Sequence, residues 1–362
     1  MQKLVKENYL MSGFFAFFLV HATQNGLSIM FYQNLIFEDA GRDAWISIVL
    51  TGLSLHFIIW MMYKMLGYPA KDVIDLHRMM FGNFFGNAIS LLMVGYFFIL
   101  ALSVFRGYIE IIEVWMFPTL KTWVLALLLI CIIYYLVSGG LRVLTGFSLF
   151  SVLFSIIIML LLFFPLQNGQ RENLFPLFDH SIQDMLKSCK SSSILFIGFE
   201  TLLLYFPFLK FPEKSAKWAH FGLLSNTIQY FIAIVATTLY FSQGMIKHTN
   251  WHLLVMTKSV EFSLIARFEF IVIGMWLIIL IPVLCISIWS CTRIIKRVTN
   301  LKPQVSLLFI LITFFIAALP FNDRFKAEAL GKFVGVLGFY FIYAYIPLLF
   351  IIYLIVSKRK KA

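Results

Sequence analysis

The chain has 362 residues, of which 61% are hydrophobic and 13% are charged. Soluble domains are typically about 45–50% apolar and about 25% charged, so the composition excludes an ordinary soluble protein. The net charge of +12 would suggest a nucleic-acid partner in a soluble protein. Here the basic residues lie mostly in short loops and at the C-terminus, which indicates membrane topology instead. We therefore expect a lipid bilayer as partner and no nucleic acid.

Apolar runs of membrane-spanning length recur along the whole chain. They cover residues 9–36, 44–66, 86–114, 122–138, 143–165, 190–209, 218–242, 267–295, 304–320 and 333–356. The pattern predicts a single integral membrane domain over 1–362, all-α, with ten transmembrane helices. An even number places both termini on one side, and the segments on that side carry more Lys and Arg. The positive-inside rule then predicts cytoplasmic termini.

The first apolar run is interrupted near its middle by polar residues. Backbone at membrane depth leaves the helix only where it lines a cavity or is buried in protein. The interruption therefore predicts a discontinuous first helix beside a binding site. The residues expected to contact a ligand there are Thr23, Gln24, Asn25, Gly26 and Ser28.

The third run carries two further candidate pairs. Tyr96 and Leu100 lie one helical turn apart and either supply a wall of the site or take part in ordinary helix packing. Arg106 and Glu110 have i, i+4 spacing. They are either charges coupled to function or a structural ion pair near the outer surface.

The sixth run has a comparable interruption near its middle, at Gly198, Phe199, Glu200 and Thr201. A charged side chain at that depth costs about 2.5–3.5 kcal/mol, so it needs a partner, a proton or water. Glu200 is therefore either a carboxylate that couples a proton or cation to function, or a structural group that is hydrogen-bonded between helices. We expect all four residues at the same ligand site.

The two interruptions fall in the first helix of each half of the chain, in pseudo-repeats 9–165 and 190–356. Five helices per half invert the second half relative to the first, and paired discontinuous helices in inverted halves indicate a transporter-type site. Freed N–H groups suit a carboxylate and freed carbonyls an ammonium, so an amino acid fits. Alternatively, Gly26 and Gly198 only allow close helix packing.

The same positions carry a family resemblance. They are Thr23-Gln24-x-Gly26, Asp43-x-Trp45-Ile46-Ser47, Arg106 with Glu110, Phe117-Pro118-Thr119 with Trp123, and Gly198-Phe199-Glu200. In this order and spacing, the chain resembles the spore-germination permease family, the B-subunits of nutrient germinant receptors. That family belongs to the amino acid–polyamine–organocation superfamily.

The resemblance implies a five-plus-five inverted-repeat, LeuT-like fold with discontinuous helices 1 and 6. It also implies a nutrient-sensing subunit in the inner membrane of an endospore, in complex with an A-type membrane subunit and a C-type lipoprotein. A proton-coupled amino-acid transporter that uses Glu200 is the alternative. We expect no cofactor or enzymatic activity, because the chain lacks the GxSxG, GxGxxG and P-loop signatures. We also expect no metal, because the chain has no CxxC pair and no HExxH motif.

Overall fold

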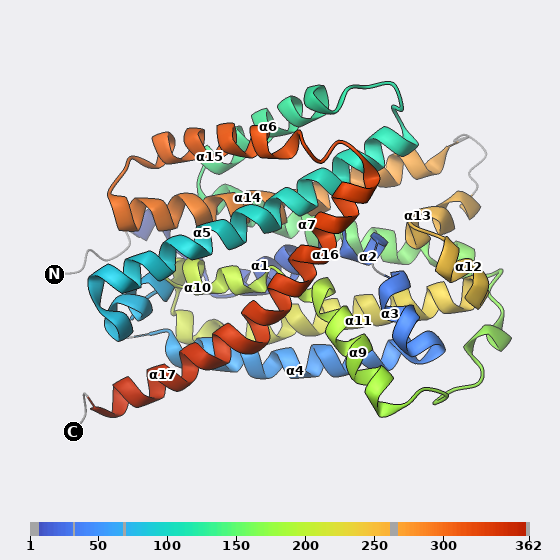
Figure 1. Cartoon of the computed structure of the whole chain (residues 1–362), viewed down its shortest axis with the longest axis horizontal. Helices are drawn as coiled ribbons and strands as arrows, with labels where there is room; N and C mark the ends of the chain where they lie inside the picture. Colours follow the sequence, from blue (N-terminus) through green and yellow to red (C-terminus); the bar gives the residue numbers. More distant parts are fainter. Residues whose placement is uncertain (1–6, 32, 68–69, 261–266, 360–362) are drawn as a thin grey trace.

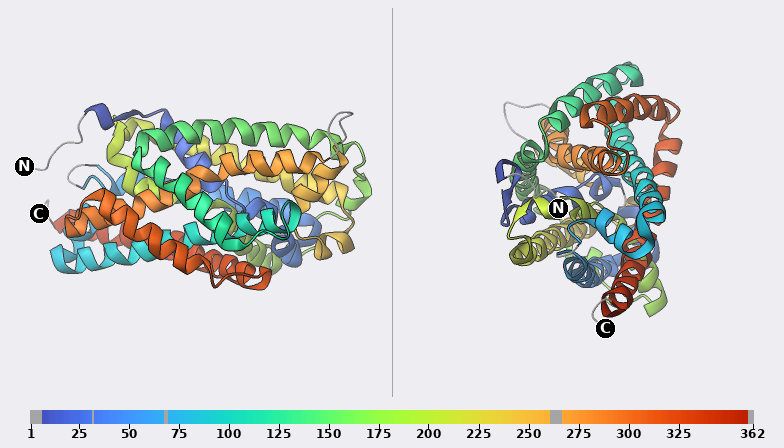
Figure 2. Two further views of the ribbon diagram at one scale, coloured as in Figure 1. Left: turned by 90° about the horizontal axis from the view of Figure 1, so that it is seen from above. Right: turned by 90° about the vertical axis from the view of Figure 1, so that its left-hand side faces the viewer.

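The computed structural model describes residues 7–31, 33–67, 70–260 and 267–359, and these form a bundle of helices (Figure 1). Figure 2 shows the bundle from above and end-on. Its α-helices are α1 Phe15–Gln24, α2 Ser28–Phe31, α3 Gln33–Ala40, α4 Ala44–Met65, α5 Val73–Trp115, α6 Thr122–Ser138, α7 Leu141–Leu161, α8 Phe163–Leu166, α9 Ile182–Ser192, α10 Leu202–Tyr205, α11 Ala216–Tyr240, α12 Gln243–His248, α13 His252–Met256, α14 Phe268–Thr299, α15 Pro303–Ala318, α16 Arg324–Tyr340 and α17 Ile346–Arg359.

Within these described ranges, six helices are long and apolar enough to cross a membrane. A seventh candidate is a pair of segments, Ile182–Phe196 and Phe199–Phe208, which meet at an angle of 54°. Three shorter apolar helices accompany them, namely α1, α6 and α15. The chain is therefore an all-α membrane protein that crosses the bilayer several times.

Most expected boundaries agree with the structure to within a few residues, and α6 covers Thr122–Ser138 as expected. The third helix differs, because it starts at Val73 rather than near 86. The Asp72 carboxylate caps it by accepting from the Asp75 N–H at 3.1 Å. Gly82, at φ 76° and ψ 174°, then bends the chain between two helical parts. The part of α5 before Gly82 contains polar residues, and for this reason the apolar run predicted a helix only from residue 86.

Two other helices also begin earlier than expected, because a side-chain cap starts each of them in polar sequence. The sixth span was expected from residue 190, but α9 starts at Ile182, and the Ser181 hydroxyl accepts from the Asp184 N–H at its first turn. The last span was expected from residue 333, but α16 starts at Arg324 after the cap Asp323. Side-chain caps favour helix starts in polar sequence.

The centre of the bundle is α14, which packs against α5 on one side and α7 on another. Its side chains are mostly buried, including Trp276 at 1% exposure. Helix α1 packs against α11 and α7. A short parallel pairing of β1 Met11–Ser12 with β2 Leu209–Lys210 joins the segments before α1 and after α10.

The start of the described chain at Glu7 and the end of α17 lie at the same end of the bundle, here called the terminal end (Figures 1 and 2). Helices α12 and α13 lie at the other end, here called the loop end (Figure 1). This arrangement agrees with an even number of crossings. Of the basic residues used for the topology prediction, Lys3, Lys6, Lys360 and Lys361 lie outside the described residues.

Candidate functional site

The first helix is broken where the sequence predicted. Helix α1 ends at Gln24, and Asn25 leaves helical geometry with φ −78° and ψ 71°. Helix α2 begins three residues later at Ser28. Thr23, Gln24 and Asn25 are all at most 1% exposed, so the break lies deep inside the protein.

Helix α11 supplies hydrogen-bond donors to this break. The Tyr230 hydroxyl donates to the Gln24 carbonyl at 2.8 Å. The Asn226 amide donates to the His21 carbonyl at 2.9 Å and to the Gln24 side-chain oxygen at 2.8 Å. The two carbonyls also accept the N–H groups of Asn25 and Gly26, so these donors add to the bonds that hold the break in place. The sequence analysis missed Asn226 and Tyr230. The feature that could have revealed them is that they are polar side chains within the apolar run 218–242.

The other polar side chains near the end of α1 differ in their partners. The Asn25 amide donates to the Gln229 side-chain oxygen at 3.4 Å. The Thr23 hydroxyl donates back to the Leu19 carbonyl at 2.7 Å and so stays on its own helix. By contrast, Nε2 of Gln24 is buried and has no hydrogen-bond partner among the described residues.

The second break lies directly against the first. Gly198 has φ +126°, and a Cβ there would stand 1.9 Å from the Thr23 carbonyl oxygen. Only glycine fits such an approach without displacing backbone. The sequence left open whether Gly26 and Gly198 serve close packing of the helices. At Gly198 the structure shows such close packing. At Gly26 no neighbouring atom lies closer than 3.9 Å to such a Cβ.

Glu200 joins the second break to α5. Its carboxyl group accepts from the Tyr96 hydroxyl at 2.5 Å and from the Gly198 N–H at 2.8 Å, and the residue is 0% exposed. Thr201 donates to the Gly198 carbonyl at 2.8 Å. The Tyr96 ring stacks on Phe341 with centroids 4.2 Å apart. Several of the expected site residues thus form one buried hydrogen-bonded cluster.

A cavity with a volume of about 100 Å³ lies beside the first break. Its lining comes mainly from α5, α16 and the residues around the break, with Asn34 of α3 and Asn250 before α13. The expected site residues in this lining are Gln24, Gly26, Ser28, Leu100 and Glu110. The expected residues outside the lining are Thr23, Asn25, Tyr96, Arg106, Gly198, Phe199, Glu200 and Thr201.

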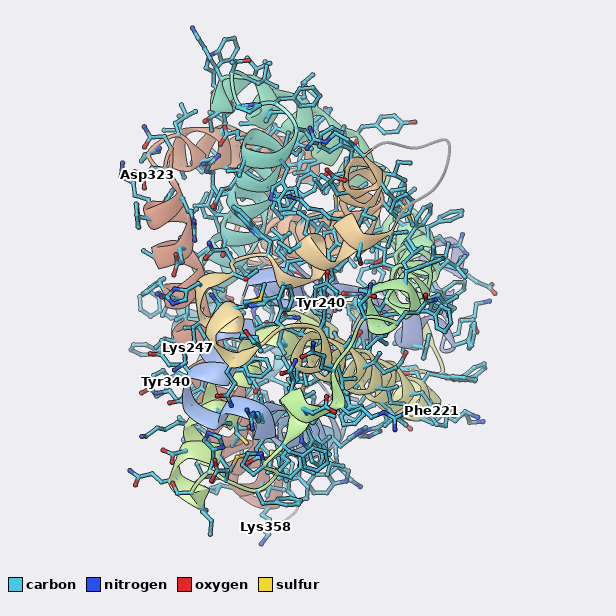
Figure 3. All side chains as sticks on the ribbon, turned by 90° about the vertical axis from the view of Figure 1, so that its right-hand side faces the viewer. Phe221, Tyr240, Lys247, Asp323, Tyr340 and Lys358 are labelled. Atoms are coloured by element: carbon cyan, nitrogen blue, oxygen red, sulfur yellow. The ribbon has the colours of Figure 1, made fainter. Side chains whose placement is uncertain are left out.

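The charged residues of the cavity differ from the expected pair. Glu110 lies 3.9 Å from Arg324 of α16 rather than pairing with Arg106. Arg106 is 1% exposed, and its Nε and Nη1 atoms have no hydrogen-bond partner among the described residues. The start of α16, next to the labelled Asp323, is seen from the loop end in Figure 3.

Asp43, part of the motif that carries the resemblance, holds a loop at this end. Its carboxylate accepts from the Phe178 N–H at 2.8 Å and the Asp179 N–H at 2.9 Å, and lies 3.2 Å from Nδ1 of His180. Asp43 itself is 1% exposed. The loop around residues 178–180 is therefore fixed to the start of α4.

Ion pairs tie the start of α5 to the end of α14. Asp72 is 0% exposed and lies 3.2 Å from Arg297 and 3.6 Å from Arg293. Asp75 lies 2.5 Å from Arg297. Arg78 donates to the Arg297 carbonyl at 2.9 Å. The first turns of α5 and the last turns of α14 are thus held together by several charged contacts.

A known structure shares this fold. A Na⁺-coupled sialic acid symporter, in a substrate-bound outward-open state, superposes with a TM-score of 0.69 over 94% of this chain and 81% of its own, at 13% sequence identity. At that identity the likeness concerns the fold alone. It agrees with a transporter architecture for the helices described above.

Sequence comparisons identify relatives over almost the whole chain. The spore germination protein GerQB of Bacillus cereus is 33% identical over 350 residues, which is 97% of each chain. Spore germination protein A2 of Bacillus subtilis (strain 168) is 25% identical over 88% of this chain and 87% of its own. The family model described as "Spore germination protein" matches residues 10–326. The chain therefore belongs to the spore germination permease family.

Proposed function

We propose that this chain is the nutrient-sensing subunit of a spore germinant receptor and binds a small nutrient, most simply an amino acid, in the cavity beside the first break. The observation that carries the proposal is the cavity itself. It reaches the break at Gln24 and Gly26, and the side-chain nitrogen of Gln24 has no hydrogen-bond partner among the described residues. Ligand cavities commonly place a few polar groups in an apolar wall.

The proposed topology is ten crossings in a five-plus-five inverted repeat with cytoplasmic termini. The seven candidate spans plus the three shorter apolar helices give ten. The breaks at 25–27 and 197–198 fall in the first span of each proposed repeat, 9–165 and 190–356. The shared end for Glu7 and α17 (Figure 1) and the likeness in fold to a symporter support this topology.

In the proposed mechanism, ligand occupancy shifts the chain between two conformations. A ligand can do this only if it binds one conformation more tightly. The ligand contacts the first break, α5 and α16 together, because all three line the cavity. The proposed recipients of the signal are an A-type membrane subunit and a C-type lipoprotein in the inner membrane of the endospore.

The second candidate function is proton-coupled transport of an amino acid, which the symporter-like fold favours. In that case Glu200 is the coupling carboxylate. Transport requires the empty and loaded protein to expose the cavity alternately to both sides. Uptake of labelled amino acids into vesicles that contain the purified chain separates this function from sensing alone.

Germination of spores that lack this chain tests the proposal. Deletion should remove the response to at least one nutrient among amino acids, sugars and ribonucleosides, and expression of the chain in trans should restore it. Release of dipicolinic acid measures the response. Unchanged germination with every nutrient would contradict a sensing role.

A further inference from the structure

The cavity is longer than a small amino acid. On α5 its lining runs from Leu100 to Glu110, and on α16 from Arg324 to Val334. Ten residues of helix at 1.5 Å each span about 15 Å. A ligand at the first break therefore leaves the outer end of the cavity, around Glu110 and Arg324, for a second group.

Glu110 at this outer end is poorly satisfied. The residue is 4% exposed, and its Oε1 atom accepts no hydrogen bond from the described residues. Its ion pair with Arg324 is long, at 3.9 Å, and the Arg324 side chain is 42% exposed. The Arg324 guanidinium lies instead over the Trp251 ring, 5.4 Å from its centroid. A buried carboxylate without close partners is costly.

The neighbouring groups of the outer end do not supply the missing donor. Glu328 and Lys332 pair with each other at 2.9 Å. Asn34 also lines the cavity, and its side-chain oxygen has no hydrogen-bond partner in the described chain. The outer end thus offers one free acceptor oxygen, that of Glu110.

We propose that the outer end of the cavity is a second subsite, where Glu110 accepts hydrogen bonds from a donor group of the nutrient. The donor is an ammonium or a pair of hydroxyls, and it takes the place beside Glu110 that Arg324 holds loosely. This inference rests on the proposed sensing function and adds which end of the nutrient is recognised, and by which residue.

The test compares dose–response curves for germination of spores that carry Glu110→Gln, Glu110→Leu or the control Glu113→Gln. Glu113 lies one turn further along α5, outside the cavity lining, and accepts from Thr122 at 2.5 Å. The probes are single L-amino acids, which carry an ammonium, and single ribonucleosides, which carry paired hydroxyls. Immunoblots of spore membranes show that each variant accumulates.

For an ammonium, Glu110→Gln should raise the half-maximal nutrient concentration by roughly 10–100-fold, because a charge-assisted bond is lost. For hydroxyls, the Gln variant should shift by less than about threefold and the Leu variant by about tenfold or more, because the Gln oxygen still accepts. Glu113→Gln should respond as wild type in both cases.

Wild-type curves for both Glu110 variants would overturn the subsite while leaving the proposed function intact. An equal shift from Glu113→Gln would also overturn it, because the effect would then not belong to the cavity. If deleting the whole chain changes no response, the proposed function fails and the subsite fails with it. Deletion spores in the same series keep these outcomes apart.

Discussion

Glu200 should hold the second break in place through its two hydrogen bonds. Its carboxyl oxygens accept from the Tyr96 hydroxyl and the Gly198 N–H, with no exposure to solvent. Glu200→Gln keeps one acceptor oxygen and turns an NH₂ group toward the other donor. One buried donor is then unsatisfied, at a cost of about 1–3 kcal/mol. Glu200→Leu leaves both donors unsatisfied, so we expect about 2–6 kcal/mol.

Thermal unfolding of the purified chain in detergent measures these losses. Tyr96→Phe removes the same bond from the other side, and so it provides a double-mutant cycle with Glu200→Gln. The combined variant should be less destabilised than the sum of the two single changes. Unfolding midpoints equal to wild type for both Glu200→Gln and Glu200→Leu would refute the structural role of these bonds.

Three further predictions concern two buried positions and the topology. Gly198→Ala should prevent accumulation of folded protein, because its Cβ would meet the Thr23 carbonyl, whereas Gly95→Ala, with open space around it, should be silent; equal accumulation of both would refute the close packing. Asn226→Leu should cost about 1–3 kcal/mol through the lost donor to the Gln24 side-chain oxygen, and an unchanged midpoint would count against that bond. Reporter fusions should place both termini in the cytoplasm, and an outside C-terminus would rule out the proposed topology.

The sequence predicted the breaks because polar residues and glycine interrupt otherwise continuous apolar runs. At Gly26 and Gly198 the structure has such interruptions. What the sequence could not show is that Gly198 packs on Thr23 and that Asn226 reaches the first break. Those contacts depend on how helices far apart in sequence are placed beside one another.

Charge pairing was harder to predict, for a related reason. Arg106 and Glu110 have the spacing of a pair within one helix, yet Glu110 faces Arg324. Helical spacing lists the partners that one helix offers, but tertiary packing decides among them. The early start of α5 at Val73 was hidden because a capped amphipathic segment has the composition of a loop, although Asp72 at its start was a recognisable capping residue.

Blocking the cavity tests the central claim most directly. Ser103 lines the cavity, and Leu92 on the same helix is 76% exposed. Equilibrium binding of a radiolabelled nutrient, chosen from those that the deletion spores fail to sense, would be measured on membranes with wild type, Ser103→Phe or the control Leu92→Phe. We predict normal binding by wild type and Leu92→Phe and none by Ser103→Phe. Undiminished binding by a folded Ser103→Phe variant would contradict nutrient recognition in this cavity.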